Sequence, residues 1–230
     1  MNEKLYEQLE LSISKTRLDE YSKILKTQDK KIIFTYYILN SEIAKSLYIP
    51  LQNLEVALRN SIHNTLTAYY KTEHWYDNDD FLLPNELKKI SEAKSKIIRA
   101  KKELTADRVI SELSFGFWTS LFSKTYDQKI WNKHTKQIFP NMLKKDRNRR
   151  VLSSKINTIR YFRNRIFHFE QIFDKQNLSQ VHKDIFEIIK WLNLSLYEIT
   201  SELDEFNSVV RNEQDRISNI LIQLSSKKSL

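Results

Sequence analysis

The chain has 230 residues, 40% of them apolar and 12% aromatic, which is enough to bury a sizeable core and argues against a disordered protein. One glycine and three prolines are too few for the frequent turns of all-β and α/β folds, so long helices with few connections are expected. The absence of cysteine excludes disulfides, zinc ribbons and thiol catalysis, and the formal charge of +9 favours a polyanionic partner.

The first half of the chain reads as helices separated by proline and a polar loop. Residues 19–48 have the pattern of one or two helices, and Pro50 is expected to open a separate helix over 51–70. A polar, aromatic loop follows at 74–80. A lysine-rich helix is then expected over 84–104.

The second half continues the helical pattern. Thr105 is a candidate N-cap for a helix that contains the apolar segment 113–118. Gly116 lies inside that segment, and we interpret it as a point of close helix–helix approach. A long final helix is expected to begin at Asn177 or Ser179 and to run to about Glu205 or beyond.

These segments predict an all-α fold, a helical bundle of roughly 7–10 helices. We expect a single domain over 1–224 and a frayed tail at 225–230. A weak boundary within the domain could fall near residue 140. The N-terminus lacks the features of a signal peptide, and no apolar run approaches the roughly 20 residues that cross a bilayer. The expectation is therefore a cytoplasmic protein without a membrane partner.

A helix expected over 151–173 carries the candidate chemistry. At about 100° per residue, one sector is apolar and must face the core, and the opposite sector is polar. Tyr161 and Phe167 flank the polar sector, and Arg163 projects between the two faces. The apolar sector contains Ile159, Phe162, Ile166, Phe169 and Phe173, and the polar sector contains Arg160, Asn164, His168 and Gln171.

A histidine with arginine and asparagine can support RNA cleavage without a metal ion. That reaction needs a base for the 2′-OH proton, an acid for the leaving 5′ oxygen and a cation near the phosphate. Because His168 alone cannot easily serve as both base and acid, we expect a homodimer that pairs two such faces. The simpler alternative is that His168 is an ordinary surface histidine.

A basic segment adjoins these residues. Between residues 144 and 165, nine basic side chains stand against Asp146 alone, a formal charge of +8. This clustering predicts contact with RNA phosphates; the alternative is a solvated helix face. The predicted RNA-binding residues are Lys144, Lys145, Arg147, Arg149, Arg150, Lys155, Arg160 and Arg165, and Arg163 is the ninth basic residue.

The segment Arg163–His168 resembles the arginine, polar residue, three residues, histidine pattern of HEPN ribonuclease domains. Together with Leu54–Asn60, Trp75-Tyr76 and Leu113–Trp118, it follows the order seen in bacterial abortive-infection (Abi-like) proteins, with the AbiD/AbiF group the closest fit. The resemblance covers roughly residues 15–200.

The resemblance implies a HEPN-like helical protein of antiphage defence: a toxic, metal-independent RNA endonuclease that acts as a dimer. By this comparison Arg163 and His168 are catalytic, and Asn164 is the adjacent polar residue. Some relatives are held in check by an inhibitory partner, RNA or protein. Many HEPN proteins bind RNA without cleaving it, so a ribonucleoprotein with a small noncoding RNA is the alternative function. A third possible function is that of a helical protein-interaction module.

A second arginine–histidine pair lies on the helix expected over 51–70. Glu55, Arg59 and His63 are spaced at i, i+4 and i+8, beside Asn60. The spacing from arginine to histidine is one residue short of the catalytic pattern. We therefore favour a structural Glu55–Arg59 network, and keep open that these residues line the RNA groove.

The remaining polar and aromatic residues support weaker interpretations. No cofactor and no metal site are expected. The acidic run Asp77, Asp79 and Asp80 lacks the glycine and glutamate of a calcium loop and reads as solvated. We expect surface positions for His74, His134 and His182, and core positions for Trp118, Trp131 and Trp191. Four aromatic residues near the loop are either core or platforms for unpaired bases: Tyr69, Tyr70, Trp75 and Tyr76.

Overall fold

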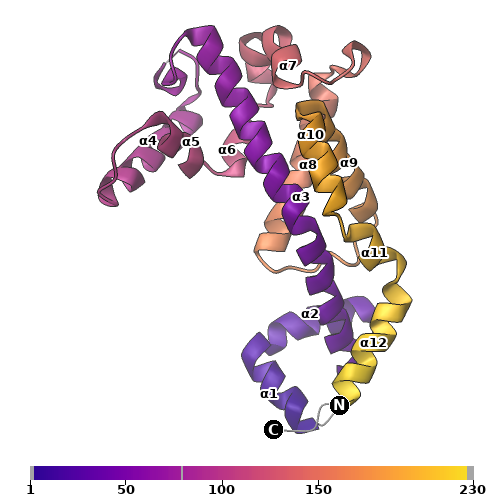
Figure 1. Cartoon of the computed structure of the whole chain (residues 1–230). Coiled ribbons are helices and arrows are strands. Elements are labelled where there is room, and N and C mark those ends of the chain that lie inside the picture. Colours follow the sequence, from indigo (N-terminus) through magenta and orange to yellow (C-terminus); the bar gives the residue numbers. More distant parts are fainter. Residues whose placement is uncertain (1–2, 79, 227–230) are drawn as a thin grey trace. The chain divides into compact units, whose positions relative to one another are not determined.

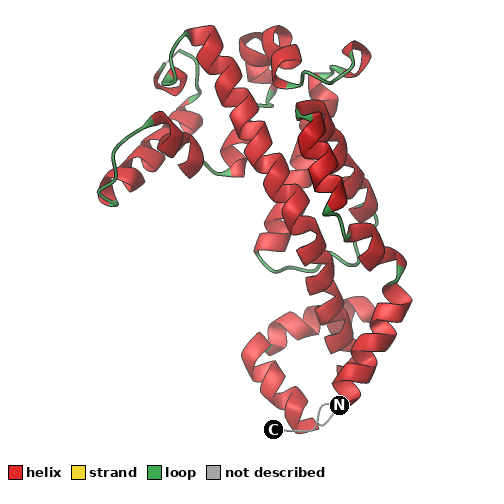
Figure 2. Cartoon of the chain, viewed as in Figure 1, coloured by secondary structure: helices red, strands yellow, loops and turns green. Residues whose placement is uncertain are grey.

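The computed structural model describes residues 3–78 and 80–226 (Figure 1). The regular elements of these residues are helices, with no strand among them, which confirms the all-α prediction (Figure 2). No described helix is both long and apolar enough to cross a membrane. The helices are α1 (Glu3–Ile13), α2 (Lys15–Leu25), α3 (Lys30–Tyr70), α4 (Pro84–Arg99), α5 (Ala106–Glu112), α6 (Phe115–Ser120), α7 (Asn132–Ile138), α8 (Arg149–Phe167), α9 (Leu178–Leu192), α10 (Leu194–Glu202), α11 (Phe206–Arg211) and α12 (Glu213–Ser226).

The chain divides into two compact units, each built from separate segments. Unit 1 comprises residues 1–49, 162–182 and 203–230, and unit 2 comprises residues 50–161 and 183–202. Helices α3, α8 and α9 each contribute to both units, because the divisions fall within them. Asp79 of the acidic run and residues 227–230 of the predicted tail lie outside the described residues.

Helix α3 shows that the predicted break at Pro50 is wrong. The helix continues through Pro50 for 41 residues. A proline inside a helix removes one backbone hydrogen bond and typically costs about 3 kcal/mol. Here buried leucines lie on both sides of it, among them Leu47, Leu51 and Leu54, and their burial outweighs that cost. The division between the two units falls at this proline.

Aromatic side chains make up much of the core of unit 1. The Tyr6 ring meets the edge of Phe34, with 5.0 Å between the ring centroids. The rings of Tyr21 and Phe173 stack at 5.5 Å. Phe173 is half-buried against this core, and it lies beyond the end of α8 rather than on the expected helix. An ion pair of 2.7 Å between Arg216 of α12 and Glu42 of α3 adds a polar contact within the same unit.

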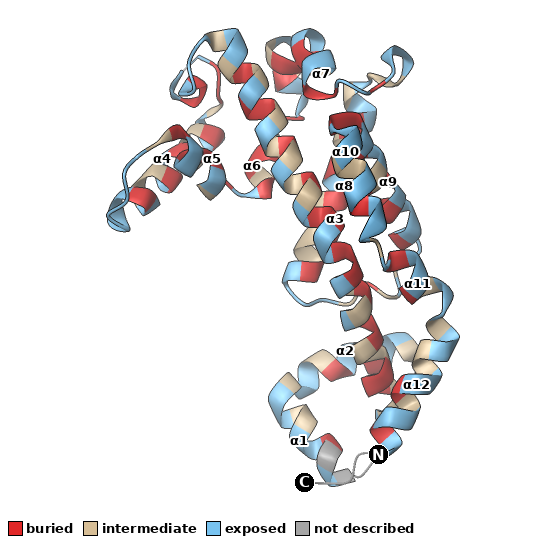
Figure 3. Ribbon diagram, in the orientation of Figure 1, coloured by how far each residue is buried: buried red, intermediate tan, exposed pale blue. Residues whose placement is uncertain are grey.

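Unit 2 has a core built around tryptophans. Trp118, Trp131 and Trp191 are buried, which confirms their predicted core positions. Buried and exposed positions alternate along the helices of each unit (Figure 3). Trp75 and Tyr76 form a short 3-10 turn and are fully buried, and the Trp75 ring lies 6.4 Å from Trp118. Trp75 and Tyr76 are therefore core residues, and no base can stack on them in this fold.

The segment after Thr105 differs from its prediction in two respects. Thr105 does cap α5, since its hydroxyl accepts a hydrogen bond from the Arg108 amide. The helix then stops, because Leu113 is extended, and α6 begins only at Phe115. A Cβ built on Gly116 would meet only the Ser114 hydroxyl, at an ordinary 3.5 Å, so the expected close helix approach is wrong.

The expected long final helix is also interrupted, once at Asn193 and once just before α11, whose N-cap position is Glu205. Asn193 ends α9 and accepts a hydrogen bond of 2.9 Å from the Leu196 amide of α10. Asp204 accepts one of 3.1 Å from the Phe206 amide at the start of α11. Asparagine and aspartate are preferred N-caps because their side chains satisfy amides that no helical carbonyl reaches. Each of them restarts a helix where the apolar periodicity alone predicts continuity.

Candidate functional site

The candidate histidine lies at the C-terminal end of α8. Phe169 adopts a left-handed backbone conformation with φ 56°. The Glu170 amide donates to the Arg165 carbonyl at 2.9 Å, and the Phe169 amide donates to the Ile166 carbonyl at 3.0 Å. These two bonds define a Schellman motif. His168 is therefore the C-cap residue, immediately after the last helical residue.

This motif corrects the predicted helix over 151–173. The apolar stripe is buried as far as Ile166, but Phe169 is 74% exposed and does not face the core. Phe173 reaches Tyr21 and Tyr36 from an irregular segment. The apolar spacing continues past Phe167 in the sequence, but the left-handed residue at position 169 turns the chain out of the helix.

Buried Asn40 of α3 holds the segment that follows. Its side-chain oxygen accepts hydrogen bonds from the amides of Ile172 at 2.7 Å and Phe173 at 3.2 Å, and its amide group donates to the Glu170 carbonyl at 3.2 Å. The Arg17 guanidinium of α2 donates to the Phe169 carbonyl. Within unit 1, the backbone around His168 is thus tied to α2 and α3. Nothing in the local pattern of α3 or α2 distinguishes these two residues.

The three candidate catalytic residues differ in their surroundings. His168 is exposed and Asn164, one turn earlier in α8, is half-buried. Among the described residues, no side-chain hydrogen bond or ion pair involves the His168 imidazole or the Asn164 amide group. The Arg163 guanidinium lies over the Phe167 ring, 4.2 Å from its centroid. All three belong to unit 1.

Arg165, a predicted RNA-binding residue, makes contacts within its own loop. Its guanidinium forms an ion pair of 2.9 Å with Glu170 and donates to the Gln171 carbonyl at 2.8 and 3.1 Å. These contacts connect the last turn of α8 to the segment beyond the Schellman motif. Arg165 thus stabilises the backbone on either side of His168.

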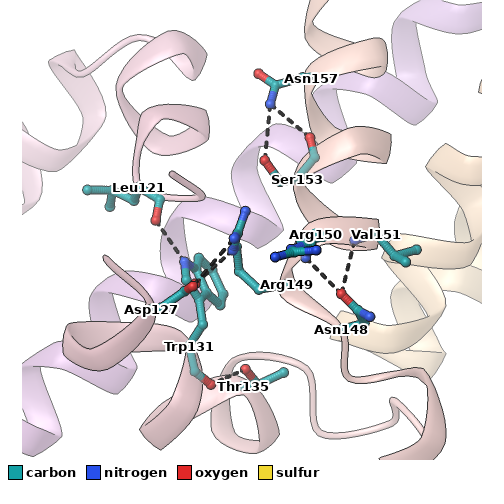
Figure 4. Close-up of polar contacts among 10 residues, drawn as sticks. All are labelled: Leu121, Asp127, Trp131, Thr135, Asn148, Arg149, Arg150, Val151, Ser153 and Asn157. Atoms are coloured by element: carbon teal, nitrogen blue, oxygen red, sulfur yellow. Dashed lines mark hydrogen bonds and ion pairs between the residues drawn. The ribbon is translucent and has the colours of Figure 1, made fainter. Parts of the chain in front are cut away.

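Two more of the predicted RNA-binding residues make contacts within the protein. They are Arg147, just before α8, and Arg149, its first residue. Arg149 forms a two-pronged ion pair with Asp127, at 2.7 and 3.4 Å (Figure 4). The Arg147 guanidinium donates twice to the Met142 carbonyl, at 2.9 and 3.2 Å. Both guanidinium groups are engaged inside unit 2.

Lys155 joins α8 to α9 in unit 2. Its ammonium group contacts Asp184 and lies 2.9 Å from Glu187. Burial on its own would lower the pKa of Lys155, but hydrogen bonds to the two carboxylates outweigh it and the pKa is raised. The two ion pairs keep the Lys155 ammonium group charged and engaged with carboxylates of α9.

The other predicted RNA-binding residues are more accessible. Lys144, Lys145 and Arg150 are exposed, and no ion pair within the described residues involves them. Arg160 is half-buried, and its Nε atom is buried without a hydrogen-bond partner. Within the part of the chain that the structure describes, carboxylates from outside the basic segment pair with Arg149, Lys155 and Arg165 and offset part of its formal +8; they belong to Asp127, Glu170, Asp184 and Glu187.

The second arginine–histidine pair lies on α3 in unit 2. His63 is buried, and its Nδ1 accepts a hydrogen bond of 3.0 Å from the Trp75 indole. Burial lowers the pKa of His63 below its ordinary value. Glu55 and Arg59 are half-buried, and the Arg59 Nε lies 3.3 Å from the side-chain oxygen of exposed Asn60. His63 therefore packs in the core, and the Glu55–Arg59 network stays a prediction.

Two of the histidines expected at the surface are buried. The His182 ring stacks on Phe206 and its Nε2 lies 2.9 Å from an Asp204 oxygen. His134 packs against Tyr69, with 4.5 Å between ring centroids, and burial lowers its pKa. Only for His74 is the surface prediction confirmed. No group of three or more acidic or histidine side chains in the described residues could hold a metal ion.

Comparison with known proteins gives no further guide to this site. No family model matches the chain, and neither does any curated protein or any solved structure. The resemblance to abortive-infection proteins consequently stays a hypothesis that depends on the motif residues and their geometry.

Proposed function

We propose that the chain acts on RNA as an antiphage abortive-infection effector, a metal-independent HEPN-type endoribonuclease that uses Arg163 and His168. The observation that carries the proposal is the contrast at the end of α8. Arg165 is engaged in structural contacts, whereas the His168 imidazole is exposed on a backbone held by α2 and α3. A histidine presented in this way is available to a substrate.

The proposed reaction is a transesterification at an RNA phosphate. A base removes the proton from the 2′-OH, the 2′ oxygen attacks phosphorus, and the bond from phosphorus to the 5′ oxygen breaks as an acid protonates that oxygen. The products are a 2′,3′-cyclic phosphate and a 5′-OH. In this scheme His168 moves a proton, Arg163 stabilises the charge that develops on the phosphate, and Asn164 orients the substrate.

Because one imidazole cannot easily be both base and acid, we propose that a second copy of the chain completes the site. Each copy then contributes His168 to a shared RNA-binding surface. Inactive His168→Ala chains added in excess are expected to lower the activity of the wild-type chain, since mixed pairs hold a single histidine. An inhibitory RNA or protein would keep such an effector inactive in the cell.

The test is cleavage of end-labelled RNA in the presence of EDTA. Removing a positioned acid or base costs roughly 10²–10⁴-fold in rate, so we expect a loss of that size for His168→Ala. Removing a group that stabilises charge in the transition state costs roughly 10²–10³-fold, which we expect for Arg163→Ala. His74→Ala and Arg211→Ala, which alter exposed residues elsewhere, serve as matched controls and should retain the wild-type rate. The cleaved ends should carry a cyclic phosphate.

Two outcomes would contradict the proposed metal-independent nuclease activity. One is full activity in both His168→Ala and Arg163→Ala, and the other is cleavage that EDTA abolishes. Circular dichroism of each variant separates lost chemistry from lost fold.

A non-catalytic RNA-binding protein is the second candidate, and the exposed Lys144, Lys145 and Arg150 favour it. Three accessible cations bind phosphates whether or not His168 acts on the bound RNA. In this case RNA purifies with the protein at moderate salt, its affinity survives His168→Ala, and no new RNA ends form. Sequencing the copurified RNA and its ends decides between the two functions.

A further inference from the structure

Phe169 has an unusual backbone conformation for its residue type. Its φ of 56° lies in the left-handed region, at the position after a helix where glycine is preferred. An aromatic residue there meets steric strain that glycine avoids. A strained residue of this kind persists because the surroundings stabilise it, and it is a reason to look for a role in function.

Other helix ends in the chain show that the turn itself does not need an aromatic residue. Lysines occupy three other left-handed positions, Lys26, Lys71 and Lys101, and all three are exposed. An exposed lysine keeps its charge in water, whereas an exposed phenylalanine leaves apolar surface in water. The left-handed conformation is common to these four positions and ends α8 at Phe169, so the exposed aromatic ring is the feature that the helix end does not require.

Further flat side chains lie in the same unit next to His168 in sequence or in contact with its neighbours. Phe167 is 41% exposed and stacks near Tyr48, which is 49% exposed, with 5.9 Å between the ring centroids. The Arg163 guanidinium lies over Phe167. Aromatic rings and guanidinium planes are the groups on which proteins stack unpaired RNA bases.

The backbone of Phe169 is held in place rather than left loose. Arg17 donates a hydrogen bond to the Phe169 carbonyl, and Asn40 binds the carbonyl of the next residue, Glu170. A ring on a held backbone loses less conformational entropy when a ligand binds it. These contacts present the ring to solvent one residue after the candidate catalytic histidine.

We propose that the Phe169 ring stacks on an unpaired nucleobase of the RNA, beside the phosphodiester on which His168 acts. This inference rests on the proposed function and adds a substrate-binding residue to it. Base stacking would give the exposed ring at residue 169 a role, and the exposed pair Phe167 and Tyr48 offers further aromatic surface in the same unit.

The test compares Phe169→Gly with Phe169→Tyr. The probe is a short single-stranded RNA with 2′-fluoro groups, which lacks the attacking 2′-OH, and with 2-aminopurine at successive positions. Phe169→Gly should bind about tenfold more weakly, as expected for one lost base stack, and should lose the fluorescence quenching at one position. Its thermal midpoint should equal or exceed that of the wild type, because glycine relieves the strain.

Phe169→Tyr should restore both affinity and quenching, since it keeps a ring at the same place. Leu203→Ala removes another exposed apolar side chain of unit 1 and should bind as the wild type does. This set of variants separates stacking from fold, because a purely structural residue would not lose affinity while the protein gains stability.

Unchanged affinity and quenching in Phe169→Gly would overturn the inference. So would a dimer that dissociates in Phe169→Gly with RNA affinity per chain unchanged, because the ring would then contact a second copy. If His168→Ala abolishes cleavage while Phe169→Gly behaves as the wild type, only this inference fails. If the wild-type chain neither binds nor cleaves RNA, the proposed function fails with it.

Discussion

At the scale of single residues, the histidines have different environments although the sequence pattern treats most of them alike. His168 and His74 are exposed, whereas His63, His134 and His182 are buried. Burial favours the neutral imidazole unless a negative charge compensates. His63 must also be unprotonated at Nδ1, because that atom accepts the Trp75 indole hydrogen bond. Burial lowers the pKa values of His63 and His134, and these two residues therefore make the stability of the fold sensitive to acid.

The lowered pKa of His63 predicts that the fold loses stability in mild acid. The unfolded chain binds a proton near pH 6.5 and the folded chain only at lower pH, so the free energy of unfolding falls as pH drops below about 6.5. Urea unfolding at pH 7.5 and pH 5.5 should show this decrease. His63→Gln, which can still accept the indole hydrogen bond, should make the decrease smaller.

His74→Gln is the control for this experiment, because it makes the same substitution at an exposed histidine. A His63→Gln protein with the same loss of stability between the two pH values would show that other groups, such as His134, dominate.

At the scale of elements, α8 is defined by contacts at both of its ends. It begins where Asn148 accepts hydrogen bonds from the amides of Arg150, at 2.9 Å, and Val151, at 3.4 Å (Figure 4). It ends at the Schellman motif, which Asn40 supports from α3 through the following segment. The cap and the motif fix which residues are helical, and so they determine that His168 stands at the helix end.

Loss of the N-cap should destabilise the fold without affecting the chemistry directly. Asn148→Ala is expected to lower the free energy of unfolding by about 1 kcal/mol, because two amides at the start of α8 lose their acceptor. Asn148→Asp keeps an acceptor and should stay within about 0.5 kcal/mol of the wild type. Urea denaturation followed by circular dichroism measures both.

Equal stability of Asn148→Ala and the wild type would mean that water replaces the cap at no cost. Since the cap lies in unit 2 and His168 lies in unit 1, neither variant should alter RNA cleavage below its unfolding transition.

At the scale of the whole molecule, the net charge overstates what RNA can reach. Arg149, Lys155 and Arg165 are paired with carboxylates, and Arg147 is bonded to a carbonyl. A paired cation releases fewer counterions on binding RNA, because its partner already neutralises it. The exposed and unpaired basic residues of the segment should therefore account for most of its salt-dependent affinity.

This distribution predicts which substitutions change the salt dependence of RNA binding. Replacing Lys144, Lys145 and Arg150 with glutamine should reduce the slope of log affinity against log salt by about 2, since each phosphate contact on a single strand contributes about 0.7. The matched control replaces exposed Arg99, Lys101 and Lys102 with glutamine. It lowers the formal net charge of +9 by the same amount, three positive charges.

The control should leave the slope close to that of the wild type. Equal effects of the two triple variants would show that the overall charge, and not the segment that begins at Lys144, attracts RNA.

The sequence alone determined the helical class and much of the core. The scarcity of glycine and proline indicated helices, and Thr105 was a candidate N-cap; the structure confirms both. The apolar periodicity correctly placed Ile159, Phe162 and Ile166 in the core, but it was wrong for Phe169. Trp118, Trp131 and Trp191 are core residues as predicted. Local signals succeed here because helix formation depends on neighbours within about four residues.

Only the tertiary structure decided where α8 ends and which cations are engaged. The carbonyl of Glu170 is bound by Asn40, 130 positions away in sequence, and the carboxylate that pairs with Arg149 comes from Asp127. No periodicity within one helix contains such partners. Since a polar side chain is held by whichever group the fold brings to it, the accessibility of His168 and of each basic residue is a property of the folded chain.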